Sequence, residues 1–217
     1  MFSSNILFSR TFLIISLMLL ITSATAYINR DFETRTEYWI TLILSFVALF
    51  AVMIFSDQFP VNLILVATFS GLMGWSMGPT ITSIGRRVRK NNIGGEEKWN
   101  QVLSMTIFGT ALGIFSTAGL IFFTDFDFYF LGKFLFIGLI VLIIIGILNM
   151  FLHFPLMRIF QSYFGVLIFI GYLLYDFSKL EKLAQNDTWS VAINLAVDIY
   201  LDIINLFLYL LQIFSDD

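Results

Sequence analysis

Val197-Asp198-Ile199-Tyr200-Leu201-Asp202-Ile203-Ile204-Asn205-Leu206-Phe207 is an apolar run that carries two carboxylates and one amide. In a helix that turns ~100° per residue, these three polar side chains fall within about a quarter of the surface. Asn194, Tyr209 and Gln212 fall in the same sector. Polar groups are costly in hydrocarbon, so the stripe has to face protein or water. We therefore expect segment 190–214 to be a membrane helix that other helices surround.

The chain as a whole has the composition of a membrane protein. It has 217 residues, of which 59% are hydrophobic and only 12% are charged. Because a spanning helix needs about 20 mostly apolar residues, the sequence predicts seven such helices, and the loops between them are too short for another domain. We expect an all-α fold, a single polytopic domain over residues 1–217 and a seven-helix bundle with the last helix central. The predicted helices are 11–28, 38–56, 60–83, 101–124, 132–152, 156–179 and 190–214.

The first segment and the orientation each leave an alternative open. Arg10, the apolar run 12–21 and Ala24-Thr25-Ala26 are also typical of a secretory signal with a cleavage site. Lys and Arg are enriched in cytoplasmic loops. With seven spans, the loops on the N-terminal side carry fewer of these residues than the loops on the other side, so charge alone places the N-terminus outside.

Several classes of site are excluded by composition. The chain has no cysteine and one histidine, His153, so disulfides, thiolate metal sites and multi-histidine sites are ruled out. The net charge of −3 and one short basic cluster in a loop do not indicate nucleic acid. We expect the lipid bilayer as the environment and no bound cofactor. Four acidic residues near segment ends are predicted to be solvated: Asp125, Asp127, Asp216 and Asp217.

A third carboxylate, Asp176, lies in the sixth predicted helix directly after the apolar run Tyr172–Tyr175. One interpretation pairs it with Lys179 at i+3, with both side chains reaching the membrane surface. The other places it opposite Asp202, where two carboxylates in a low dielectric share a proton and titrate together, or bind a cation instead. On the second interpretation Asp176, Asp202 and Asp198 form a pH sensor, and Tyr172, Asn194 and Asn205 support it.

The third predicted helix carries Gly71, Gly74 and Gly78 on one face, followed by Pro79. Glycines on one face allow a close approach of two helices. A proline inside a helix kinks it and frees a carbonyl one turn earlier. We interpret this segment as a packing surface, with an ion-path role as the alternative.

These segments resemble the Bax inhibitor-1 family, also called the transmembrane Bax inhibitor motif proteins. Val197–Phe207 resembles the family's last helix, and Gly171-Tyr172-Leu173-Leu174-Tyr175-Asp176 resembles its sixth. Similarity to the bacterial YccA-like branch is carried by Gly71-Leu72-Met73-Gly74 with Gly78-Pro79, by Gly109-Thr110-Ala111 and by Thr22–Thr25. The resemblance implies a seven-helix bundle with the last helix inside the other six.

The resemblance also implies a function. Family members are associated with a pH-sensitive Ca²⁺ leak through a di-aspartate site, which by motif is Asp176 and Asp202 here. The YccA-like branch is linked to restraint of a membrane-bound AAA protease in bacteria, which implies the inner membrane. The family is usually drawn with a cytoplasmic N-terminus. This orientation conflicts with the distribution of Lys and Arg among the predicted loops, which places the N-terminus outside. Lys179 is unusual at its position, and no Lys or Arg occurs from Thr36 to Gly85 to act as a basic clamp.

The residues and the resemblance together are compatible with three functions. The leading hypothesis is a non-enzymatic calcium leak gated by proton sharing, in which Asp176 and Asp202 form a weak site for the transported ion. The second is a regulator that binds a membrane AAA protease or other membrane proteins. The third is an intramembrane aspartyl protease, in which two carboxylates activate water. Those enzymes carry Gly-x-Gly-Asp at the second aspartate, whereas this chain has Ile199-Tyr200-Leu201-Asp202.

Overall fold

The computed structural model describes residues 6–31, 35–124, 126–152, 154–185 and 188–216. Within these ranges, seven helices are long and apolar enough to cross a membrane, which confirms the predicted all-α fold. They are α1 (Ile6–Ile28), α2 (Arg35–Ile54), α3 (Val61–Asn91), α4 (Gly95–Phe123), α5 (Gly132–Leu152), α6 (Pro155–Lys182) and α7 (Trp189–Asp216), with the short 3₁₀ helix η1 (Tyr129–Leu131) before α5.

The last helix is the most buried of the seven. In the most apolar 18-residue window of α7, 61% of the residues are buried, against 17–39% in the other six helices. The other helices expose many large apolar side chains, as expected of surfaces that face lipid. The polar stripe of α7 is thus carried by the helix that is best shielded from lipid, as predicted.

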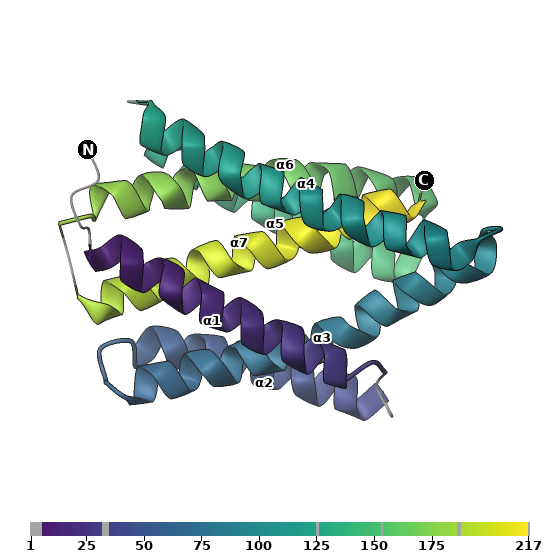
Figure 1. Ribbon diagram of the computed structural model, residues 1–217, viewed down its shortest axis with the longest axis horizontal. Helices are drawn as coiled ribbons and strands as arrows, with labels where there is room; N and C mark the ends of the chain where they lie inside the picture. Colours follow the sequence, from purple (N-terminus) through teal and green to yellow (C-terminus); the bar gives the residue numbers. More distant parts are fainter. Residues whose placement is uncertain (1–5, 32–34, 125, 153, 186–187, 217) are drawn as a thin grey trace. The chain divides into compact units, whose positions relative to one another are not determined.

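The chain divides into two compact units. The first contains Met1–Arg87 and Leu183–Tyr200, and the second contains Val88–Lys182 and Leu201–Asp217. The first unit is therefore built from α1, α2, most of α3 and the beginning of α7, and the second from α4, α5, α6 and the rest of α7 (Figure 1). Both α3 and α7 contribute residues to each unit.

In the first unit, α1 and α3 approach each other through the predicted glycines. A Cβ atom at Gly74 would overlap Thr25 Oγ1 and the carbonyl oxygen of Thr22, and one at Gly78 would overlap the carbonyl oxygen of Asn29. Gly71 is different, because a Cβ there meets nothing closer than 3.9 Å. Gly74 and Gly78 thus permit backbone contact.

Pro79 lies inside α3, and the carbonyl that it frees has a partner. Proline lacks the N–H that would bond to the carbonyl of Trp75, four residues earlier. The side-chain amide of Asn29 instead donates a hydrogen bond of 2.8 Å to Trp75 O. Asn29 is 7% exposed and directly follows α1. The freed carbonyl is thus used to connect α1 to α3.

Asn29→Ala is expected to lower the free energy of unfolding by about 1–3 kcal/mol, because it leaves the part-buried Trp75 carbonyl without its donor. In a Pro79→Ala background the same substitution should cost about 1 kcal/mol or less, since an alanine in place of the proline restores the helical N–H. The measurement is thermal unfolding of the four purified proteins in detergent. Equal costs in the two backgrounds would contradict this account. The exposed Asn100→Ala serves as a control, with an expected change within about 0.5 kcal/mol.

The predicted loop over residues 84–100 was wrong. Helix α3 continues to Asn91 and α4 begins at Gly95, with Gly94 in the left-handed conformation at φ 71°. Basic residues occupy the last turn of α3 and acidic residues the first turn of α4, an arrangement that stabilises both helix ends through their dipoles. Arg89 also pairs with Glu96 at 2.8 Å and lies over the Trp99 ring. Both helices thus extend beyond their apolar segments into polar sequence, where hydropathy does not indicate a helix.

Candidate functional site

The two aspartates that the sequence singles out lie in the same unit and are both buried. Asp176 is on α6 and Asp202 is on α7, and each residue is 4% exposed. Tyr172, one turn before Asp176 on α6, is half-buried, and its phenol lies within electrostatic range of both carboxyl groups. Each of the two carboxyl groups therefore interacts electrostatically with the same tyrosine. The interpretation in which Asp176 reaches the membrane surface requires an exposed carboxylate, and burial disfavours it.

The supporting polar residues are distributed along α7. Asn205 is half-buried, and its amide nitrogen donates to Leu201 O at 2.7 Å, which leaves the amide oxygen as its group for a cation. Asn194 and Asp198 are also half-buried, and both belong to the part of α7 in the first unit. Within the second unit, the predicted set therefore reduces to Tyr172, Asp176, Asp202 and Asn205.

The C-terminal end of the stripe is used for packing. Tyr209 stacks on Phe169 with ring centroids 5.8 Å apart. Gln212 donates to Asp216 Oδ2 at 2.9 Å, and Arg158 pairs with the same carboxylate at 3.2 Å. Asp216, which was predicted to be a solvated charge, is an exposed residue, and its carboxylate is paired with Arg158. Asp125 and Asp217, predicted to be solvated too, lie outside the described residues.

The chemistry of the site is that of a weak cation ligand set. Among the residues that the structure describes, no group of three or more His, Cys, Asp or Glu side chains is placed to hold a metal ion. Ca²⁺ takes six to eight oxygen ligands. Two carboxylates therefore need amide, carbonyl or water oxygens in addition. Trp75 O, the carbonyl that Pro79 frees, accepts a hydrogen bond from Asn29 and belongs to the first unit, whereas Asp176 and Asp202 belong to the second.

A family model described as "Inhibitor of apoptosis-promoting Bax1" matches residues 4–217 of this chain. The chain belongs to the Bax inhibitor-1 family. It is 31% identical to Protein LIFEGUARD 1 of Arabidopsis thaliana over 218 residues, which cover 94% of this chain and 86% of the relative. It is 30% identical to an uncharacterized protein of Helicobacter pylori strain J99 over 190 residues, 86% of this chain and 76% of that one. A vaccinia virus protein named Golgi anti-apoptotic protein is 43% identical over 88 residues, 40% of this chain and 35% of its own length.

This Bax inhibitor-1 family protein also contains a buried polar cluster that sequence reasoning missed. Tyr200 is 0% exposed and its hydroxyl lies 2.6 Å from Thr22 Oγ1, which also donates to Ser70 O at 3.0 Å. The three residues come from α7, α1 and α3 of the first unit. The only sequence signal was that Tyr200 and Thr22 are polar groups inside predicted spans. Because the hydroxyls satisfy each other, the cluster fixes three helices together without a charge.

Proposed function

We propose that this multi-pass membrane protein is a pH-sensitive calcium leak pathway in which Asp176 and Asp202 share a proton. The single observation that carries the proposal is that two carboxyl groups are 4% exposed in one unit, both within electrostatic range of Tyr172. Two ionised carboxylates cannot be held cheaply in a low dielectric, so a proton or a cation has to neutralise them. Such a pair titrates as a unit.

The same pair accounts for permeation and not only for binding. A conducted ion has to leave its site again, so a site with few protein ligands suits a leak better than a strong one. Protons and Ca²⁺ compete for the same oxygens, which makes the leak depend on pH. No catalytic step is needed, and we propose a non-enzymatic role. From the glycine motif of α3 we further propose membership of the bacterial YccA-like branch and a place in the bacterial inner membrane.

Calcium flux into liposomes tests the proposal directly. Wild-type protein should give a flux that changes with pH between 6 and 8, whereas Asp202→Asn should give one that does not. Glu97→Gln is the matched control, because it removes an exposed carboxylate from the same unit and should retain the wild-type pH profile. Equal and pH-independent fluxes for wild type and Asp202→Asn would reject the leak mechanism.

The alternative role is a regulator that binds a membrane AAA protease, and the same variants separate it from the leak. In that role the carboxyl pair only sets the conformation of the protein. Asp202→Asn would then change recovery of the purified protease with the immobilised protein while the liposomes show no calcium flux in any variant.

A further inference from the structure

The segment Phe126–Leu131, here called the strap, connects α4 to α5 and is attached to the last two turns of α6. The backbone N–H of Phe128 donates to Ser178 Oγ at 3.1 Å, and Ser178 is 2% exposed. All of these residues belong to the second unit. Ser178 lies only two residues after Asp176, so the strap is attached to the part of α6 that carries the proposed site.

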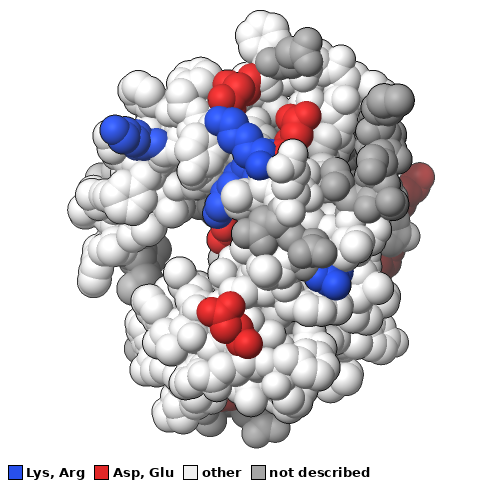
Figure 2. Space-filling model, turned by 90° about the vertical axis from the view of Figure 1, so that its left-hand side faces the viewer, with Lys and Arg blue, Asp and Glu red and all other residues white. Residues whose placement is uncertain are grey.

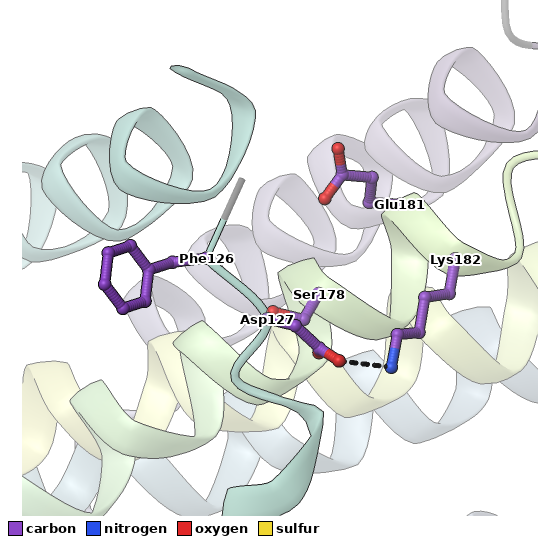
Figure 3. Close-up of a pocket in the computed structure, with 5 residues that line it drawn as sticks. All are labelled: Phe126, Asp127, Ser178, Glu181 and Lys182. Atoms are coloured by element: carbon purple, nitrogen blue, oxygen red, sulfur yellow. Dashed lines mark hydrogen bonds and ion pairs between the residues drawn. The ribbon is translucent and has the colours of Figure 1, made fainter. Parts of the chain in front are cut away.

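Lys182 connects the end of α6 to the strap twice. Its ammonium group donates to Asp127 Oδ2 at 2.7 Å and lies 4.4 Å from the centroid of the Tyr129 ring. Figure 3 shows Asp127 and Lys182 pointing toward each other beside Ser178, with Glu181 directed away from the pair. These residues and Phe126 line a cavity of about 200 Å³. In Figure 2, acidic and basic side chains lie next to one another in the upper part of a mostly uncharged face, and other charged side chains stand apart from them.

Two tyrosines complete the attachment. The rings of Tyr129 in the strap and Tyr175 on α6 are stacked, with centroids 5.2 Å apart and an interplanar angle of 23°. Gly132, the first residue of α5, lies against the same Tyr175 ring, where a Cβ would be 2.8 Å from it. Tyr175 therefore packs between the strap and the start of α5, immediately before Asp176.

The strap packs on the face of α6 that is opposite Asp176. At ~100° per residue, Ser178 is about 200° from Asp176, Lys182 about 240° and Tyr175 about 260°. Leu180 lies on the face of Asp176, at about 40°, and is 0% exposed. By binding the face of α6 opposite Asp176, the strap thus holds the last turns of α6 in the rotational position that keeps Asp176 and Leu180 buried.

We infer that the strap is a latch that holds α6 in the conformation closed to bulk water, and that its release opens the proposed calcium pathway. The second part rests on the proposed function. In the structure both carboxyl groups are buried, so contacts that stabilise this conformation oppose permeation. Weakening those contacts shifts the population toward a conformation in which water and ions reach Asp176.

The latch is not the pH sensor of the leak. The pKa of Asp127 is lowered from its ordinary value of 3.8, first by its hydrogen bond with Lys182 and then by the Tyr129 N–H. A lowered carboxyl pKa means that the ion pair stabilises the folded state above about pH 4 and is lost as the pH falls below that value. Asp127 therefore stays ionised between pH 6 and 8, so variants of the latch should change the amount of flux and not its pH profile.

Because the chain has no cysteine, a single introduced cysteine reports on the latch. Leu180→Cys should react slowly with a membrane-impermeant maleimide in otherwise wild-type protein. Adding Tyr129→Ala should accelerate labelling about tenfold, because one aromatic stack and one cation–π contact are lost. Adding Phe130→Ala is the matched control, since Phe130 is the adjacent aromatic side chain and is 65% exposed.

Amide hydrogen exchange of residues 175–182 repeats the comparison without a cysteine, in case Leu180→Cys fails to fold. Equal labelling or exchange in Tyr129→Ala and Phe130→Ala would overturn the latch, whatever the flux. Calcium flux in Tyr129→Ala should rise about fivefold with an unchanged pH profile. Faster labelling without more flux would overturn the gating role alone. An absence of calcium flux in wild type would instead reject the proposed function, and labelling would still decide whether the strap holds α6.

Discussion

Gly74→Ala is expected to lower the free energy of unfolding by about 3 kcal/mol, a fall in Tm of roughly 10 °C for a chain of this length. The added Cβ would overlap Thr25 Oγ1 and the carbonyl oxygen of Thr22, and would lie 2.8 Å from Thr22 Cα. Two of these three atoms are backbone atoms, which cannot move away by a change of side-chain rotamer. Helix α1 or α3 would have to move. Thermal unfolding in detergent measures the change.

Gly71→Ala provides the control on the same helix. Its Cβ would meet only side-chain methyl groups at 3.9 Å, an ordinary van der Waals contact, so Tm should stay the same or rise slightly because alanine favours helix. Thr25→Ala removes one of the three overlapping atoms but should not rescue Gly74→Ala, because the Thr22 backbone remains in place. A full rescue, or equal Tm values for the two alanine variants, would show that α1 and α3 do not approach at their backbones.

The second large effect concerns the carboxyl pair. If Asp176 and Asp202 share one proton, removing either destroys the shared state. Asp176→Asn and Asp202→Asn should then each abolish the pH response of calcium flux, and the double variant should behave like either single variant. This non-additivity distinguishes a coupled pair from two independent charges. The measurement is flux against pH for all four proteins.

Asp198→Asn is the internal control for that cycle. Asp198 is one turn before Asp202 on α7 but is only half-buried. The Asp198→Asn variant should retain a pH-dependent flux, because Asp198 is not a member of the proposed pair and belongs to the first unit. Effects of Asp176→Asn and Asp202→Asn that simply add would contradict proton sharing, even if each variant alone lowered the flux.

Much of the fold follows from hydropathy, because lipid requires about 20 apolar residues per span and each of the seven helices meets that requirement. The stripe on α7 correctly identified the most buried helix. Hydropathy gave no signal for the ends of α3 and α4, where polar residues continue the helices and the helix dipoles and the Arg89–Glu96 pair stabilise them. The loop predicted there was therefore wrong.

The candidate site was predictable only in part. Asp176 and Asp202 stood out because carboxylates are costly in lipid, and both are indeed buried. The contacts that fix the neighbouring helices were not predictable to the same degree. The pairing of Lys182 with Asp127 spans 55 residues in the chain, and neither residue is unusual alone. The hydrogen bond from Asn29 to Trp75 O was likewise not predictable from either residue alone. It forms because Pro79 leaves that carbonyl without its helical donor.

The helical hairpin formed by the ends of α3 and α4 has a practical use for imaging. Only residues 92–94 separate the two helices, and the pair of Arg89 and Glu96 connects them. A small folded domain inserted between Asn91 and Gly95, with both helices extended into it, would inherit a fixed direction from them. Such a fusion would supply a rigid marker for aligning single-particle images of a protein of 24.9 kDa, which by itself offers little mass outside a detergent micelle.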